Sequence, residues 1–198
     1  MSTDPETISF YDTNAAAYAE FAIEVTEHPK LVAFANALPP GARVLDLGCG
    51  VGWAAAALRD LGFAVDAQDA STGLAAEAKT RFDLDVRVAP FDALEAEGYY
   101  DGVFCHFALQ HTPVEAREDV FGRIARALKP KGVFYAGVQS DPEPWRDEIS
   151  RLYNPFSHET LRTLCAQVGM TVEKIETGQG KGYDGRPSEN AYLWARHG

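Results

Sequence analysis

The sequence predicts a single α/β domain in which a mostly parallel sheet is covered by helices on both faces. The strongest observation is the segment 44–52, VLDLGCGVG, where an apolar run ends and glycines follow at every second position before an alanine-rich stretch. This is the pattern of a buried strand, a tight turn and a helix. Strand-like and helix-like runs then alternate along the chain, as is typical of parallel sheets. A chain of 198 residues is long enough for one such domain.

The first forty residues predict two helices. The first helix has aromatic and small residues at helical spacing, namely Phe10, Tyr11, Ala15, Tyr18 and Phe21. The second helix runs from about Pro29 to Leu38 and ends at Pro39-Pro40-Gly41, because proline cannot continue a helix.

The segment 41–140 alternates between the two element types. Strands are expected where short apolar runs occur, at 43–47, 63–68, 86–89, 102–105 and 133–138. Helices are expected between them at 53–61, 72–82 and 114–128. Gly62 ends the first of these helices, Ser71 is the expected N-cap of the second, and Lys129-Pro130-Lys131-Gly132 closes the third.

The last part of the chain, 141–198, begins with a loop rich in proline and aromatic residues. A helix is expected near 159–168, and strands at 171–175 and 191–195 are expected to flank a glycine-rich loop at 178–187. We therefore expect the chain 1–198 to form one domain.

Composition limits the classes of function. The net charge of −11 argues against a nucleic-acid partner, since proteins that bind phosphate backbones usually have a basic face. Three separated cysteines, Cys49, Cys105 and Cys165, are typical of reduced thiols in a cytosolic protein. The N-terminus is polar and acidic, unlike a signal peptide, and no apolar run approaches the roughly 20 residues of a membrane span. We expect a cytoplasmic protein without a membrane partner.

The ligand of an open parallel sheet lies outside the carboxyl ends of its strands, so the turn after the first strand is a candidate site. Gly48, Gly50 and Gly52 allow a sharp bend and close contact between a ligand and the main chain. Asp46 would repel a pyrophosphate but suits a ligand with an ammonium or sulfonium charge. Trp53 stands where a dinucleotide-binding turn would need a small residue.

With Asp69, Asp92, the segment 99–111 and the segment 128–133, this turn resembles the motifs of class I S-adenosylmethionine-dependent methyltransferases. The resemblance covers roughly 40–138, in the expected order, although Lys131 stands where the family usually has a glycine. A fainter similarity to methyltransferases of the tellurite-resistance type lies in 62–67 and in the overall length.

The resemblance implies a Rossmann-like class I methyltransferase fold: a seven-stranded, mostly parallel sheet whose last strand is antiparallel. It implies S-adenosylmethionine as cofactor and S-adenosylhomocysteine as product. It also divides the domain into an N-terminal helical lid at 1–40, a cofactor-binding core at 41–140, and a substrate-side helix with the terminal strand pair at 141–198.

Further cofactor contacts are expected at the ends of the second and third strands. Asp69 is placed to accept hydrogen bonds from both ribose hydroxyls, although it could instead only cap the next helix. Asp66 lies inside its strand and is expected to be a solvated charge. Asp92 is placed to accept a hydrogen bond from the adenine amino group, although loop aspartates are common. The expected cofactor-binding residues are Asp46, Gly48, Cys49, Gly50, Gly52, Trp53, Asp69, Ala70, Ser71, Phe91, Asp92, Ala93 and His106.

The expected chemistry is in-line displacement at the sulfonium methyl group, with the protein aligning the reactants and excluding water. His106, His111 and Tyr11 are the candidate catalytic residues, and a histidine with a near-neutral pKa can act as a base. Each histidine could instead hold a loop carbonyl. Relatives that methylate amino groups begin an Asn-Pro-Pro-Tyr motif at the position of His106, so its absence argues against a nucleobase or glutamine amide as acceptor. Metal binding by His106, His111 and Cys105 is not expected, because the sequence shows no pattern of carboxylates that would orient such ligands.

The candidate substrate-binding residues lie on the lid, after the fourth and fifth strands and in the glycine-rich loop: Tyr11, Tyr18, His111, Arg146, Tyr183 and Arg186. Arginine grips carboxylate or phosphate, so a small anionic or aromatic metabolite is the expected acceptor. The arginines could equally make surface ion pairs. A monomer or a homodimer is expected.

Two other hypotheses stay open. A non-catalytic S-adenosylmethionine-binding regulator or partner subunit would keep the cofactor half of the domain but would have a filled or apolar acceptor pocket. An NAD(P)-dependent oxidoreductase is disfavoured by Asp46, by Trp53 and by the missing third dinucleotide glycine. A protein substrate also stays open.

Overall fold

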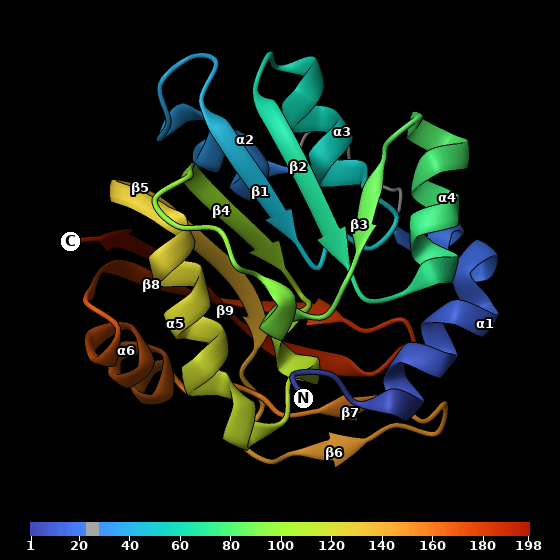
Figure 1. The fold of residues 1–198 in the computed structure, drawn as a ribbon. Coiled ribbons are helices and arrows are strands. Elements are labelled where there is room, and N and C mark those ends of the chain that lie inside the picture. Colours follow the sequence, from blue (N-terminus) through green and yellow to red (C-terminus); the bar gives the residue numbers. More distant parts are fainter. Residues whose placement is uncertain (23–27) are drawn as a thin grey trace.

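The main sheet has seven strands in the order β3-β2-β1-β4-β5-β9-β8. The computed structural model describes residues 1–22 and 28–198 (Figure 1). The strands are β1 (Arg43–Leu47), β2 (Ala64–Asp69), β3 (Val86–Val88), β4 (Tyr100–His106), β5 (Leu128–Gln139), β8 (Met170–Lys181) and β9 (Pro187–His197). The first five strands pair in parallel, and β9 is antiparallel to both β5 and β8. The predicted fold class is therefore confirmed.

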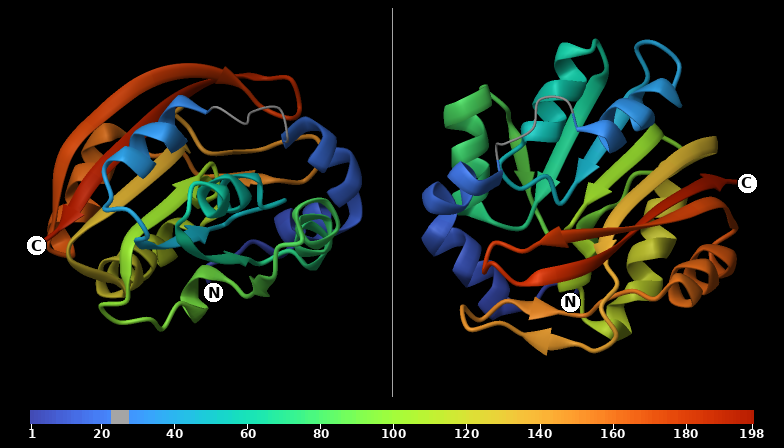
Figure 2. Two further views of the ribbon diagram at one scale, coloured as in Figure 1. Left: turned by 90° about the horizontal axis from the view of Figure 1, so that it is seen from above. Right: turned by 180° about the vertical axis from the view of Figure 1, so that it is seen from behind.

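Helices lie on both faces of this sheet, as Figure 2 shows from two further directions. One face carries α2 (Pro29–Asn36), α3 (Trp53–Asp60) and α4 (Thr72–Phe82), and the other carries α5 (Arg117–Ala127) and α6 (His158–Gln167). The N-terminal helix α1 (Pro5–Ala22) packs beside α4. Short 3-10 turns occur at Phe91–Ala93, Leu109–His111 and Val114–Ala116.

The core follows from the two-residue period of the buried strands. Along β4, Phe104 points to the face that holds α2 and α3, whereas its neighbours Val103 and Cys105 point to the face that holds α5 and α6. All three side chains are fully buried. A central strand that is covered on both faces is therefore apolar at successive positions, as parallel sheets require.

Several predicted boundaries agree with the structure. The ranges of β1 and α4 are as predicted, and Ser71 caps α4 by accepting a hydrogen bond from Leu74 N at 3.1 Å. The predicted helix at 114–128 divides into a 3-10 turn and α5. The segment 129–132 follows the end of α5 at Ala127, as expected, but it already belongs to β5, which begins at Leu128 and has a shift of register against β4.

The predicted glycine-rich loop at 178–187 is too long, because 178–181 and 187 belong to the strands of a hairpin and only 182–186 connect them. Gly178 pairs with Asn190, and the pairing continues to Lys181 and Pro187. A Cβ at Gly178 would lie 2.7 Å from the ring of Tyr192, so glycine is needed for the close packing of this hairpin rather than for a flexible loop.

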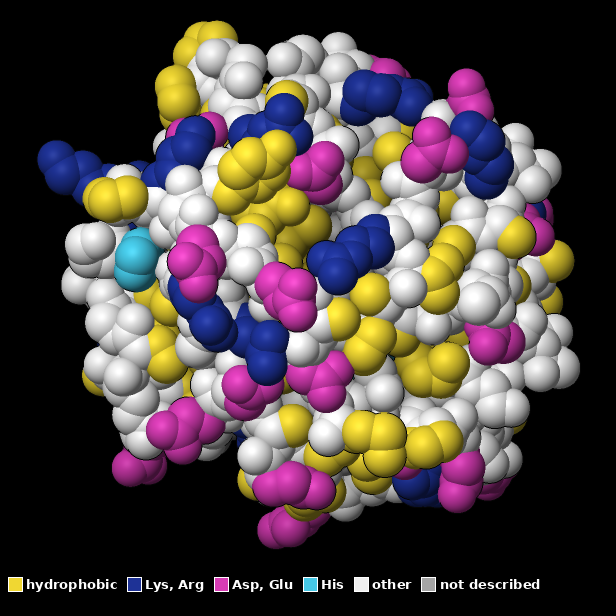
Figure 3. Space-filling model, in the orientation of Figure 1, with side chains coloured by type: hydrophobic (Ala, Val, Ile, Leu, Met, Phe, Trp, Pro, Cys, Tyr) yellow, Lys and Arg dark blue, Asp and Glu magenta, His cyan; other side chains and the backbone are white. Residues whose placement is uncertain are grey.

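The two strands outside the main sheet, β6 (Trp145–Arg146) and β7 (Leu152–Tyr153), form a small separate sheet near the N-terminal end of α1 (Figure 1). The face that carries α5 and α6 shows basic and acidic side chains interspersed (Figure 3). Among the helices that the structure describes, none has the length and apolar character needed to span a bilayer. The proposed division into lid, core and substrate side stays a prediction.

Candidate active site

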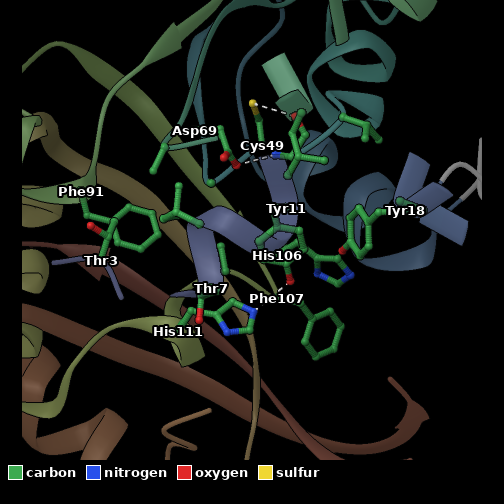
Figure 4. Close-up of a pocket in the computed structure, with 18 of the residues that line it drawn as sticks. Thr3, Thr7, Tyr11, Tyr18, Cys49, Asp69, Phe91, His106, Phe107 and His111 are labelled. Atoms are coloured by element: carbon green, nitrogen blue, oxygen red, sulfur yellow. Dashed lines mark hydrogen bonds between the residues drawn. The ribbon is translucent and has the colours of Figure 1, made fainter. Parts of the chain in front are cut away.

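A pocket of about 770 Å³ lies at the carboxyl ends of β1, β2 and β4, and the N-terminal segment closes one side of it (Figure 4). The N-terminal segment contributes Thr3, Asp4, Thr7, Ile8, Tyr11, Tyr18 and Ala22. The sheet edge contributes Gly48, Cys49, Gly50, Val51, Trp53, Asp69, Ala70, Leu74, Phe91, His106, Phe107, Ala108 and His111. The candidate residues at successive strand ends are thus brought together, as the parallel topology requires. We call this the first pocket.

The glycine turn forms the floor of the first pocket. Gly48 has φ of +71°, and a Cβ there would lie 2.4 Å from the Cβ of Ala108. Its amide and that of Cys49 donate hydrogen bonds to Gln68 O at 2.7 and 3.1 Å, which ties the turn to β2. Gly52 does not line the pocket but is the left-handed N-cap of α3.

Asp46 is buried beside this turn and does not itself line the pocket. Its Oδ2 has no hydrogen-bond partner among the described residues. Burial, together with the nearby charge of Asp69, raises the pKa of Asp46 to about 7. An unpaired buried carboxyl oxygen is costly unless a donor reaches it. Because Asp46 lies outside the pocket lining, its expected contact with a cofactor stays a prediction.

Asp69 lines the first pocket and fixes the turn at the same time. Its Oδ2 accepts a hydrogen bond from Gly50 N at 2.8 Å, and its Oδ1 accepts one from Ser71 N at 2.9 Å. Burial raises its pKa. Because a carboxylate has about four lone-pair sites, acceptor capacity remains for two ligand hydroxyls. Ser71 itself does not reach the pocket, because its hydroxyl caps α4 and donates to Asp12 at 2.7 Å.

The segment after β3 is placed differently from the expectation. Phe91 lines the first pocket, but Asp92 and Ala93 do not. The Oδ2 of Asp92 accepts a hydrogen bond from Ser2 N at 3.2 Å, and Asp92 N donates to Ser2 Oγ at 3.0 Å. The carboxylate of Asp92, which was expected to face adenine, is therefore hydrogen-bonded to Ser2 of the N-terminal segment instead.

His106 and Trp53 stand on the opposite wall of the first pocket, with their ring centroids 6.0 Å apart. Nδ1 of His106 lies 2.9 Å from the hydroxyl oxygen of Tyr135. Burial, together with the neighbouring charges of His28 and Lys30, lowers the pKa of His106 to about 3. The imidazole of His106 is therefore neutral near pH 7 and lines the pocket. The near-neutral pKa that was expected for His106 is not found.

Tyr11 and His111 form a directed hydrogen-bonded pair. Nδ1 of His111 lies 2.6 Å from Leu152 O, which can only accept, so we assign the proton to Nδ1. Nε2 then accepts the O–H of Tyr11 at 3.1 Å. Burial lowers the pKa of His111 to about 4 and raises that of Tyr11. The pair is therefore a neutral phenol and a neutral, weakly basic imidazole.

Arg151 lies beside this pair and lines the site. Its guanidinium, 2% exposed, donates to Tyr11 Oη at 3.4 Å and pairs with Asp147 Oδ2 at 2.8 Å. It also lies 5.2 to 5.9 Å from the ring centres of Phe10, Tyr11, Tyr153 and Tyr183. The spacing of Asp147 and Arg151 is the one signal in the sequence that could have indicated an ion pair.

A second pocket of about 700 Å³ adjoins the first and shares Tyr11, Tyr18, Phe107 and His111 with it. Its other walls include Tyr183, Tyr153 and Tyr192, four amide side chains and Arg151. The structure thus brings four of the expected substrate-binding residues together: Tyr11, Tyr18, His111 and Tyr183.

The other two expected substrate-binding residues, Arg146 and Arg186, line neither pocket. Arg146 pairs with Asp4 at 2.9 Å, and Arg186 lies 4.2 Å from the ring centre of Trp145. Both arginines are therefore engaged at the surface of the small sheet. Within the part of the chain that is described, no group of three or more His, Cys, Asp or Glu side chains is placed to hold a metal ion.

Comparison with known proteins identifies related sequences. A family model described as a methyltransferase domain matches residues 44–132. The ubiquinone biosynthesis O-methyltransferase of Xanthomonas campestris pv. campestris is 36% identical over 103 residues, which cover 48% of this chain and 42% of that protein. The demethylmenaquinone methyltransferase of Beutenbergia cavernae is 36% identical over 141 residues, which cover 69% of this chain and 56% of that protein. The chain thus spans about half the length of these curated relatives.

Solved structures share the fold. The 1,6-didemethyltoxoflavin-N1-methyltransferase of Burkholderia thailandensis, with 1,6-didemethyltoxoflavin and S-adenosylhomocysteine bound, superposes with a TM-score of 0.78. It is 22% identical, and the match covers 97% of this chain and 87% of that one. A methyltransferase of Methanosarcina mazei gives a TM-score of 0.74 at 16% identity, covering 85% and 97%.

Proposed function

We propose that the chain is a class I S-adenosylmethionine-dependent methyltransferase, and that it transfers the sulfonium methyl group to a small-molecule acceptor by in-line displacement. The observation that carries the proposal is the pair of adjoining pockets, which share Tyr11, Tyr18, Phe107 and His111. One pocket contains the glycine turn and Asp69, and the other contains polar side chains for an acceptor. Two reactants can therefore meet at the shared residues.

The first pocket is the proposed cofactor site. Asp69 would accept the ribose hydroxyls, Phe91 would contact the adenine ring, and the glycine turn with Asp46 would lie beside the charged amino-acid end. When bound, S-adenosylmethionine supplies an activated methyl group. The residues of this chain align the acceptor with it and exclude water.

The Tyr11–His111 pair is the proposed route for the proton of the acceptor. The acceptor would donate to Tyr11 Oη, and Tyr11 would pass its own proton to His111 Nε2, 3.1 Å away. A base with a pKa of about 4 can take a proton only from a strong acid. The pair therefore suits a weakly basic hydroxyl or ring nitrogen, which becomes strongly acidic once methylated, better than it suits an aliphatic amine.

The names of related proteins support a small-molecule acceptor. The curated relatives are methyltransferases of ubiquinone biosynthesis and of demethylmenaquinone, and the toxoflavin-type enzyme holds a small heterocycle. A non-catalytic regulator is less well supported, because the second pocket is lined by polar groups and is not filled. A cytoplasmic location and a monomeric or dimeric state remain part of the proposal.

The test is calorimetric titration with S-adenosylhomocysteine and, separately, with NADH. We expect the nucleoside alone to bind, and Asp69→Asn to weaken it at least about tenfold by removing a charged acceptor. Asp66→Asn is the matched control, because Asp66 lies on the same strand in a half-exposed pair with Arg43 at 3.2 Å. Binding of NADH alone would refute the proposed cofactor.

A further inference from the structure

The second pocket contains two buried hydrogen-bond acceptors that nothing in the described structure satisfies. From them we propose that the methyl acceptor is an uncharged, planar nitrogen heteroaromatic ring that donates hydrogen bonds to Gln110 Oε1 and Gln139 Oε1. This inference rests on the proposed function, because it identifies the second pocket as the acceptor site.

The orientation of Gln110 is fixed by its own hydrogen bond. Its Nε2 donates to Phe107 O at 2.7 Å, and since a carbonyl only accepts, the amide cannot be turned round. The side chain is 3% exposed, and Oε1 has no partner among the described residues. A buried carbonyl oxygen without a donor is costly. A ligand that offers an N–H or O–H at this place would remove that cost.

Gln139 offers the second acceptor at the end of β5. Its backbone pairs with Asn190 of β9, which holds the side chain at the sheet edge beneath the second pocket. The residue is 6% exposed, and its Oε1 also has no partner in the described part of the chain. We assign this oxygen, like that of Gln110, as an acceptor for the ligand. Both oxygens are then satisfied by a ligand with at least two donors, which a simple phenol does not have.

The charges around the second pocket favour an uncharged ligand. Its described lining includes no Asp or Glu for a cation. Arg151 is paired with Asp147 at 2.8 Å, although its Nη2 donates no hydrogen bond to the described residues, and Lys181 is exposed at the end of β8. Because the charge of this guanidinium is already balanced, desolvation would oppose the binding of an anion among the amide groups.

The rings around the second pocket favour a planar ligand. Tyr183 lies 5.4 Å from Tyr18 and 5.3 Å from Phe21, measured between ring centroids. Tyr11 and His111 stand at the boundary with the first pocket. Aromatic walls of this kind stack on a flat ring, while the two glutamines select the polar edge of the ring. A ring nitrogen that carries a proton would lie near the Tyr11–His111 pair.

The experiment is calorimetric titration of the protein, saturated with S-adenosylhomocysteine, at a pH just below neutral. The probes are three uncharged heterocycles with ring N–H groups, namely lumazine, alloxazine and quinazoline-2,4-dione, together with their N,N′-dimethylated forms. 2-Naphthoate and 2-naphthol serve as an anion and a single-donor phenol of similar size. Gln139→Met removes one acceptor at nearly constant volume, and Gln179→Met makes the same change at an exposed amide of the same pocket.

We expect at least one N–H heterocycle to bind, its dimethylated form to bind at least about tenfold more weakly, and Gln139→Met but not Gln179→Met to cause a similar loss. The affinity for S-adenosylhomocysteine should stay unchanged in both variants. Tighter binding of 2-naphthoate or 2-naphthol, absence of binding by all three heterocycles, or equal affinity in the Gln139→Met variant would overturn the inference. Failure of S-adenosylhomocysteine to bind at the outset would refute the proposed function instead.

Discussion

The buried ion pair between Asp147 and Arg151 should carry a large part of the stability of the substrate side. Both side chains are nearly inaccessible, at 3% and 2% exposed. Arg151 Nε donates to Asp147 Oδ2 at 2.8 Å, while Oδ1 accepts from the backbone amides of Ile149 and Arg151 at 3.2 and 2.8 Å. Asp147→Asn keeps the backbone acceptor but leaves the guanidinium buried without its counter-charge.

Removal of one partner from a buried pair costs about 3–5 kcal/mol. That is a large share of the roughly 5–15 kcal/mol that stabilises a typical domain. In urea unfolding followed by circular dichroism, the midpoint of Asp147→Asn should therefore fall on the order of 1–2 M.

Two further variants identify the cause. Arg146→Met breaks a neighbouring pair in which Arg146 is 35% exposed, and it should cost only about 1 kcal/mol. Arg151→Met added to Asp147→Asn removes the unpaired charge and should restore part of the loss. If Asp147→Asn is no worse than Arg146→Met, the pair does not behave as a buried one and the reasoning is refuted.

Three further outcomes are expected. Tyr11→Phe should lower kcat by about 10²-fold with little change in affinity for S-adenosylhomocysteine, since it removes the link between acceptor and His111; unchanged turnover of an identified acceptor would contradict this role. The free energy of unfolding should fall as the pH drops from about 6.5 to about 4, because the unfolded chain binds protons there that His106 and His111, with pKa values of about 3 and about 4, do not bind when folded. Asp46, whose pKa is about 7, has the opposite effect, because it binds a proton more tightly in the folded than in the unfolded chain. In urea unfolding across this pH range, the free energy of unfolding of Asp46→Asn should therefore fall more steeply than that of the unchanged protein. Gly48→Ala should destabilise the protein by about 1–3 kcal/mol in thermal unfolding, because its φ is +71° and the new Cβ would meet Ala108.

Local patterns predicted the fold where the signal lies within a few residues. The glycine turn, β1 and α4 with its Ser71 cap depend on neighbouring positions, and their ranges agree with the structure. The strands β8 and β9 were predicted too short, because the glycines near their connection serve packing across strands rather than turning. Tertiary pairing here outweighs the weak strand propensity of glycine.

The candidate site divides in the same way. The parallel sheet brings Gly48, Asp69 and His106 to one edge, so order along the chain was enough to group them. Asp92 and Arg146 were misplaced because their partners, Ser2 and Asp4, are 90 and 142 residues away in sequence. Burial also sets the pKa values of the two histidines far below the free value, which composition cannot show. The catalytic and binding roles themselves stay predictions.

The N-terminal helix α1 has a consequence for the order of events in a reaction cycle. Residues of this one helix, Tyr11 and Tyr18, belong to the walls of both pockets. Asp12 also fastens it to α4 through hydrogen bonds from Ser71 and Gly73 at 2.7 and 3.0 Å. Two reactants that share a wall cannot exchange independently: a displacement of α1 that frees one alters the surroundings of the other. Under the proposed function, departure of the used cofactor and admission of the next acceptor would then depend on the same movement of α1 away from α4.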